Sequence, residues 1–235
     1  MITVLGSSSA GNACLVGGRS PLLLDCGLSV RELKKATGYR LSSLSGCLVT
    51  HCHGDHSKAA ADLMRAGVDC YMSRGTAEAL GLTGHRLKVV KPLEQFSVGD
   101  WTVLPFETVH DAAEPMGFLL AAGDEKLLYL TDTAYCPYCF RGLTRIMIEC
   151  NYDKAILEQN ILEGKLHPGM RRRLLRSHMS LDRALDFLAA NNLSEVREIV
   201  LLHLSDGNSD AGEFKRQVQA ATGRMVRVAE KGGEG

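Results

Sequence analysis

The sequence predicts an α/β or α+β layered domain in which helices cover sheets, and three observations support this fold class. Strand-like apolar segments alternate with helix-like segments through the first two thirds of the chain. The last third is mostly amphipathic helix, and no internal repeat interrupts the pattern. The 235 residues, 45% hydrophobic and 23% charged, suffice for one sizeable core. We expect a single domain over 1–235 with a frayed tail at 231–235.

The first part of the chain is expected to contain short strands joined by turns and helices. Gly6–Asn12 lacks the G-x-x-x-x-G-K pattern of a phosphate-binding loop, so it is interpreted as a turn between strands. Ser29 is a plausible helix N-cap, and Thr76 could cap a second, short helix. In chain order we expect strands at 2–5, 12–17, 20–26, 46–50 and 68–73, and helices at 29–35, 57–66 and 77–80.

The second part should begin with strands and end with helices. Ser180 is a candidate N-cap, and the apolar residues after it repeat at helical spacing as far as Asn191. One strand is expected within this helical part. The expected strands are two or three within 87–110, then 116–122, 126–131, 146–149 and 198–204, and the final helix is 210–221.

The segment 50–56, Thr-His-Cys-His-Gly-Asp-His, is the strongest functional signal. His51 and His53 are two residues apart, so their side chains point the same way if the backbone is extended. A turn at Gly54 would bring Asp55 and His56 to a second position. Imidazole and carboxylate ligands without a thiolate pair suit zinc, manganese or iron in an open site. The segment therefore predicts two ligands for each of two neighbouring divalent ions.

Further ligand candidates occur where apolar segments end. His110, Asp132 and His203 each follow a strand-like run, so a sheet would present them along one edge. Asp25 follows the apolar run Leu22–Leu24 and is either a turn residue or a carboxylate partner of a metal-bound histidine. Each residue alone is weak evidence, but His110, Asp132 and His203 bring the four candidates of the segment 50–56 to seven nitrogen and oxygen ligands.

These residues give the chain a likeness to a known family. The sequence resembles the metallo-β-lactamase fold superfamily over nearly its whole length, and within it the YycJ (WalJ) group of metal-dependent exonucleases. The stretches that carry the likeness, besides 50–56, are Gly6–Asn12, Leu24–Leu28, His110–Ala112, Glu114–Phe118, Thr131–Thr133, Ser177–Ser180 and Leu202–Ser205.

The resemblance implies a four-layer αββα sandwich with a dinuclear metal site at one edge of the sheets. It also implies 5′-to-3′ exonuclease activity on DNA. The implied ligands are His51, His53 and His110 for one ion and Asp55, His56 and His203 for the other, with Asp132 bridging. Two divalent ions suit hydrolysis of a phosphodiester, and the ligand set accommodates zinc or manganese. Asp55 is also a candidate for orienting the attacking water.

A basic segment supports an anionic substrate. The 27 Lys and Arg balance the 27 Asp and Glu, so any nucleic-acid site must be local. The densest basic stretch is 171–176, with Arg171, Arg172, Arg173 and Arg176 as candidate phosphate ligands, or else a solvated helix face. His178, close behind, is either a phosphate ligand, the acid that protonates the leaving oxygen, or a histidine bonded to the backbone.

Alternatives remain open at this point. The same site would serve a small-molecule ester, thioester, lactone or β-lactam hydrolase, although the basic stretch favours nucleic acid. Cys136 and Cys139 form a C-x-x-C pair that is either two reduced thiols or a redox switch, which leaves a non-catalytic metal-binding or redox-sensing protein as a third reading. Dispersed cysteines, no signal-peptide pattern and no apolar run of membrane-spanning length predict the cytoplasm and no membrane. The oligomeric state is not predicted.

Overall fold

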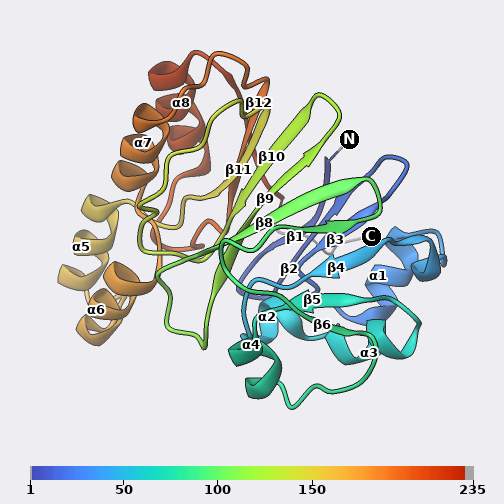
Figure 1. The fold of residues 1–235 in the computed structure, drawn as a ribbon. Helices are drawn as coiled ribbons and strands as arrows, with labels where there is room; N and C mark the ends of the chain where they lie inside the picture. The colour runs from blue at the N-terminus through green and yellow to red at the C-terminus, as the bar shows by residue number, and fades with distance from the viewer. Residues whose placement is uncertain (1, 231–235) are drawn as a thin grey trace. The chain divides into compact units, whose positions relative to one another are not determined.

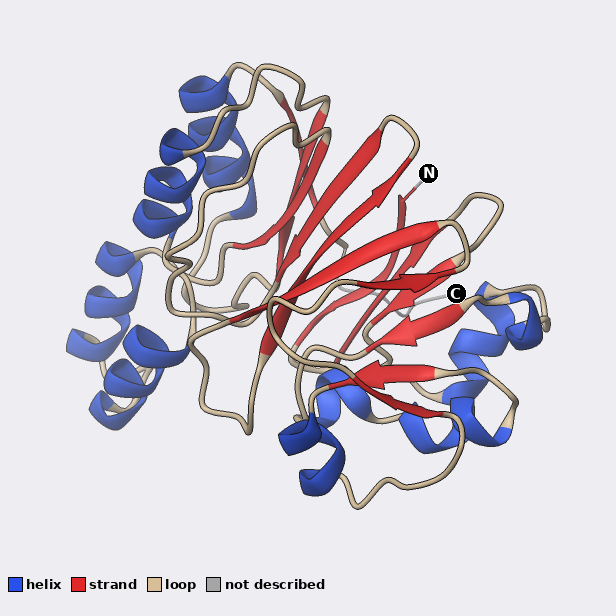
Figure 2. Ribbon diagram, in the orientation of Figure 1, coloured by secondary structure: helices blue, strands red, loops and turns tan. Residues whose placement is uncertain are grey.

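The structure is a computed structural model that describes residues 2–230, and the expected frayed tail at 231–235 lies outside the described residues. The chain divides into two compact units, described here one at a time. The first unit comprises residues 2–107, 112–122 and 230, and the second comprises 108–111 and 123–229. Strands lie in two sheets, accompanied by helices (Figures 1 and 2), which agrees with the expected α/β class. Within the described residues no helix is long and apolar enough to cross a membrane.

The first unit is built on a six-stranded sheet whose strands follow one another in chain order. The strands β1 to β3 pair antiparallel, and β3 to β6 pair parallel. These strands are β1 (Ile2–Ser8), β2 (Gly11–Val16), β3 (Leu22–Leu24), β4 (Gly46–Leu48), β5 (Cys70–Met72) and β6 (Leu87–Val89). The unit also contains an antiparallel meander that is not part of this six-stranded sheet. Its strands are β7 (Phe96–Val98), β8 (Trp101–Glu107) and β9 (Met116–Ala122).

Helices of the first unit connect the parallel strands and cover their apolar side chains. They are α1 (Val30–Ala36), a 3-10 turn (Leu41–Ser43), α2 (Gly54–Ser57), α3 (Ala60–Arg65) and α4 (Arg74–Ala79). The core contains Leu23, Val49, Leu63 and Met72, all fully buried. α1 begins as expected at Ser29, where Ser29 and Glu32 form a reciprocal capping box that satisfies two backbone N–H groups.

The second unit contains four parallel strands, β10 (Glu125–Leu130), β11 (Arg145–Glu149), β12 (Glu198–Leu202) and β13 (Met225–Val228). Its helices are α5 (Lys154–Leu162), α6 (Pro168–Ser177), α7 (Leu181–Ala190) and α8 (Ala211–Thr222), drawn in yellow to red in Figure 1. Parallel strands place their carboxyl ends at one edge of a sheet, so residues just after β10, β11 and β12 meet there.

Three expected elements were wrong in detail. The helix expected at 57–66 is two helices: the Ala59 amide donates to the Cys26 carbonyl (2.9 Å), a tertiary bond that breaks the helical ladder between α2 and α3. α4 starts at Arg74, because Ser73 rather than Thr76 is its N-cap. The C-terminal third contains a second strand, β13, which was not expected.

Candidate metal centre

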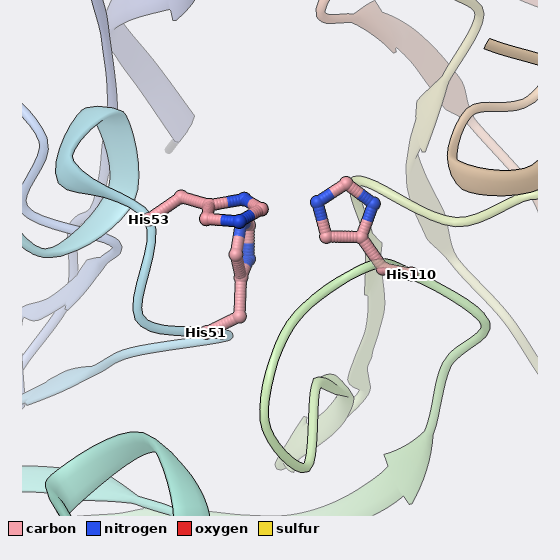
Figure 3. A group of neighbouring side chains, drawn as sticks. All are labelled: His51, His53 and His110. Carbon is pink, nitrogen blue, oxygen red and sulfur yellow. The ribbon is translucent and has the colours of Figure 1, made fainter. Parts of the chain in front are cut away.

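In the first unit, three histidines and one aspartate gather on the loop after β4 and on α2. The rings of His51 and His53, which leave the same loop (Figure 3), lie edge to face with centroids 4.8 Å apart. The His51 ring is 4.2 Å from that of His56 between centroids. Asp55 and His56 lie on α2 itself, which begins directly after His53. One turn of helix, rather than the expected tight turn at Gly54, therefore places Asp55 and His56.

Asp25, directly after β3, accepts hydrogen bonds that orient two of these histidines. His56 Nδ1 lies 2.8 Å from Asp25 Oδ2, and the Thr50 amide and hydroxyl donate to Oδ1 at 2.8 and 2.9 Å. Thr50 Oγ1 is also 3.0 Å from His51 Nδ1, so His51 Nδ1–H donates to the hydroxyl that donates to Asp25. Because both Nδ1 atoms carry the proton, the lone pair of each imidazole is on Nε2, the tautomer that binds a metal.

Asn12, at the start of β2, is a buried neighbour of the same ligands. Its Nδ2 donates to the Ser8 carbonyl at 2.9 Å and lies 3.0 Å from His56 Nε2 and 3.3 Å from Asp55 Oδ2. The bond to a carbonyl identifies this end of the amide as the NH2 group, so His56 Nε2 faces a donor and acts as acceptor. Asn12 thus supports the tautomer that Asp25 imposes.

Gly27 lets α2 approach β2 closely. A Cβ built at Gly27 would lie 1.6 Å from the Asp55 carbonyl oxygen and 2.8 Å from the Asn12 amide nitrogen. Both contacts are with backbone, which does not move aside as a side chain does. Only glycine therefore fits between the helix that carries Asp55 and the strand that carries Asn12.

In the second unit, four buried residues bring ligand atoms within 4.8 Å of one another: Asp132, Glu149, His178 and His203. Asp132 and His203 follow β10 and β12, Glu149 ends β11, and His178 follows α6. His203 Nε2 is 3.9 Å from Asp132 Oδ2, and the rings of His178 and His203 are stacked with centroids 5.5 Å apart. Parallel strand ends therefore assemble a His and carboxylate cluster within this unit alone.

Glu149 is the hub of this cluster. It is fully buried, and its carboxylate accepts from His178 Nδ1 (2.7 Å) and from the backbone amides of Thr133 (2.9 Å) and Met179 (3.0 Å). Burial alone would raise the pKa of Glu149, but the charge and hydrogen bond of His178 outweigh it and lower the pKa. Burial would lower the pKa of His178, but Glu149 outweighs it and raises the pKa. The two groups therefore form a buried carboxylate–imidazolium pair.

His110 lies in the loop after β8 and belongs to the second unit. Its Nδ1 donates to the Ser177 carbonyl at 2.7 Å, which leaves the lone pair on Nε2, 3.7 Å from Asp132 Oδ2. Burial lowers the pKa of His110, against the opposing effect of the Asp132 charge. A lowered pKa favours the neutral imidazole, the form that coordinates a metal.

Three of these residues have left-handed backbone conformations that are uncommon outside glycine. Asp25, Asp132 and His203 have φ angles of 57°, 20° and 54°, and each follows the end of a strand by one or two residues. Non-glycine residues in this region are strained, and such residues concentrate at functional sites.

The remaining sequence candidates are placed as follows. The four arginines at 171–176 are exposed on α6. Cys139 is exposed and Cys136 is partly buried, and burial raises the pKa of the Cys136 thiol to about 11. A thiol with a raised pKa is a poor nucleophile at neutral pH, so the redox reading loses support. Glu149 and Asn12 were not proposed as site residues from the sequence.

The donor set fits divalent metal ions. The Nε2 lone pairs of His51, His56 and His110, together with the carboxylates, are borderline to hard ligands, which suit zinc and manganese alike. The residues that would hold metal in the first unit are His51, His53, Asp55 and His56, and those in the second are His110, Asp132 and His203. The carboxylate at His56 Nδ1 and the carbonyl at His110 Nδ1 match the usual support of metal-binding histidines.

Comparison with known proteins agrees with this reading. Residues 21–204 match the family described as "Beta-lactamase superfamily domain". The chain is 32% identical over 227 residues to the protein named exodeoxyribonuclease YycJ of Bacillus anthracis, covering 88% of this chain and 83% of that protein.

Solved structures show the same fold. The metallo-β-lactamase fold protein YhfI from Bacillus subtilis superposes with a TM-score of 0.74 at 18% identity, covering 99% of this chain and 97% of that one. Zn(2+)-bound PqqB from Methylobacterium extorquens gives 0.73 at 15% identity, covering 98% of each chain. The resemblance and fold class inferred from the sequence are thereby confirmed. The chain belongs to the beta-lactamase superfamily and is a metallo-hydrolase of the metallo-β-lactamase fold.

Proposed function

We propose that this protein is a dinuclear metal-dependent phosphodiesterase, and specifically a 5′-to-3′ exonuclease on DNA. The observation that carries the proposal is the pairing of preset histidine tautomers with buried carboxylates in each unit, in a chain 32% identical to a protein named as an exodeoxyribonuclease. Both units would serve one function, as a single domain, because the family match at 21–204 includes parts of each.

The proposed ligand roles are those that the resemblance to the metallo-β-lactamase superfamily implies. His51, His53 and His110 would hold one divalent ion, Asp55, His56 and His203 would hold the other, and Asp132 would serve both. Two such ions would supply activation of a water and neutralisation of charge on the phosphoryl oxygen. Zinc and manganese both suit the ligands, and zinc is the ion named for the PqqB structure.

The protein's own groups then orient and move protons. Asp55, a carboxylate on the first turn of α2, orients the attacking water through a hydrogen bond. His178 protonates the leaving oxygen: its Nδ1–H is bonded to Glu149, and its raised pKa favours a second proton on Nε2. Asp25, with support from Asn12, keeps His56 in the orientation that ligation needs.

Substrate binding is assigned to α6, and within it to the exposed arginines that have no acidic partner among the described residues. Arginine guanidinium groups bind phosphates irrespective of base sequence, as an exonuclease requires. We place the protein in the cytoplasm, where its eight cysteines, all free thiols, would remain reduced. Fractionation of cells that produce the protein tests this location.

The activity is tested on end-labelled single- and double-stranded DNA and RNA. Metal-stripped protein is refilled separately with Mn or Zn, and metal content is measured beside cleavage. Progressive shortening of DNA from the 5′ end, lost in His53→Ala, is the expected result. Protein that holds two metals per chain but cleaves no nucleic acid would contradict the proposal, and hydrolysis of a lactone or thioester would then replace it.

A further inference from the structure

The four arginines of α6 are not equivalent. Arg171 Nε donates to Glu158 Oε1 on α5 at 2.6 Å, and Arg173 Nε lies 3.3 Å from Asp111 Oδ2. The side chains of Arg172 and Arg176 are exposed and make no hydrogen bond or ion pair with any other residue within 2–230. Two of the four guanidinium groups are thus paired with carboxylates within the second unit, and the other two can bind an anionic ligand.

The two available arginines form a row. They are four residues apart, so they share one face of the helix and are separated along its axis by about 6 Å. Arg176 is two residues before His178, and the carbonyl of Ser177 between them accepts from His110. Arg176 is therefore at the end of α6 that leads into the ligand cluster of the second unit, and Arg172 is one helical turn further from that cluster.

Helix stability does not account for both charges. Arg176 is in the last turn of α6, where a positive charge interacts favourably with the helix dipole. Arg172 is in the middle of the helix, where that effect is small, and it has no acidic partner among the described residues. An exposed guanidinium with no intramolecular partner beside a hydrolytic site suggests an anionic ligand.

We propose that Arg172 and Arg176 bind two consecutive phosphates of the substrate strand next to the scissile bond. Arg171 and Arg173 instead fix α6 within the second unit and contribute little to binding. The inference rests on the proposed function and deepens it, because it requires a polymeric nucleic acid rather than a small ester. Contacts of this kind position a strand and carry no base specificity.

The test compares matched substitutions on one helix. Arg172→Gln plus Arg176→Gln is compared with Arg171→Gln plus Arg173→Gln, so each double variant loses two charges. The metal-loaded proteins are assayed on a single-stranded 20-mer and on bis(p-nitrophenyl) phosphate, at several salt concentrations. Thermal unfolding of each variant checks that α6 remains folded.

For Arg172→Gln plus Arg176→Gln we expect a higher KM on the 20-mer and a salt dependence of log(1/KM) shallower by about 1.4, since each lost single-strand phosphate contact contributes about 0.7. The loss on the 20-mer should exceed that on the small diester. The Arg171 and Arg173 variant should keep the wild-type salt slope.

Two failures are distinguishable. If the wild type cleaves the 20-mer and the Arg172 and Arg176 variant has the same salt slope, only the assignment of these two arginines is overturned. The same holds if both double variants lose slope equally. A wild-type protein that cleaves the small diester but no nucleic acid overturns the proposed function together with the inference.

Discussion

Replacing Glu149 with glutamine should strongly destabilise the second unit even without metal. The carboxylate has three donors at 2.7–3.0 Å: His178 Nδ1 and the amides of Thr133 and Met179. Glutamine has one carbonyl oxygen and an NH2 group. If the oxygen faces His178, the NH2 group opposes two backbone N–H groups, and if it faces those amides, the imidazolium loses its counterion.

The magnitude follows from these losses. A buried donor without an acceptor costs about 1–3 kcal/mol, and breaking a buried ion pair by removing one partner costs about 3–5 kcal/mol. We therefore expect Glu149→Gln to lower the free energy of unfolding by about 3–5 kcal/mol. At a urea m-value of about 2–3 kcal/mol/M, the midpoint falls by roughly 1–2.5 M.

The assay is urea unfolding of metal-stripped protein at pH 7, followed by circular dichroism and fluorescence. Glu195→Gln is the control, because Glu195 is exposed and loses no buried partner, and its midpoint should stay close to wild type. A Glu149→Gln midpoint within about 0.3 M of wild type, roughly the error of such a fit, with an unchanged slope, would refute the conclusion that Glu149 is a buried, charged acceptor of three hydrogen bonds.

Three further predictions concern separate groups. Asp25→Asn should weaken metal binding about 10–100-fold, measured by competition with a chromogenic chelator, because the one remaining oxygen cannot accept from both His56 and Thr50; unchanged affinity contradicts the role of Asp25. The raised pKa of His178 means that its contribution to stability is full below its ordinary value of 6.5 and is lost as pH rises through the folded value. As pH rises above 6.5, the stability of the metal-free protein should therefore decline less in His178→Gln than in wild type, and parallel declines would exclude the pair. Cys136, whose pKa is raised to about 11, should react with iodoacetamide at pH 7.5 more slowly than a free thiol of ordinary pKa, and rapid labelling would revive the redox reading.

The sequence predicts those parts of the protein in which local signals and tertiary structure agree. The α1 N-cap at Ser29 is such a case, since the capping partner Glu32 is three residues away. The alternation of strands and helices likewise predicted the fold class, and the likeness to the metallo-β-lactamase superfamily is confirmed by the family match.

Other features depend on contacts that no local pattern contains. The break between α2 and α3 is set by Cys26, which is more than thirty residues from Ala59. Glu149 ends an apolar strand like many acidic residues, and only the parallel pairing of β10, β11 and β12 brings it to the histidines. Asn12 is one polar residue in a Gly/Ser turn, and its place beside His56 follows from the close approach at Gly27.

The left-handed backbone at Asp25 and His203 has a consequence for how the protein balances folding against metal uptake. Each such residue costs about 1–2 kcal/mol relative to an ordinary conformation, and glycine would relieve that cost. Asp25→Gly and His203→Gly therefore gain backbone energy that offsets part of what their lost hydrogen bonds cost. Because the folded chain already holds this backbone conformation, binding of an ion would require no backbone change at His203 or at the aspartate that supports His56.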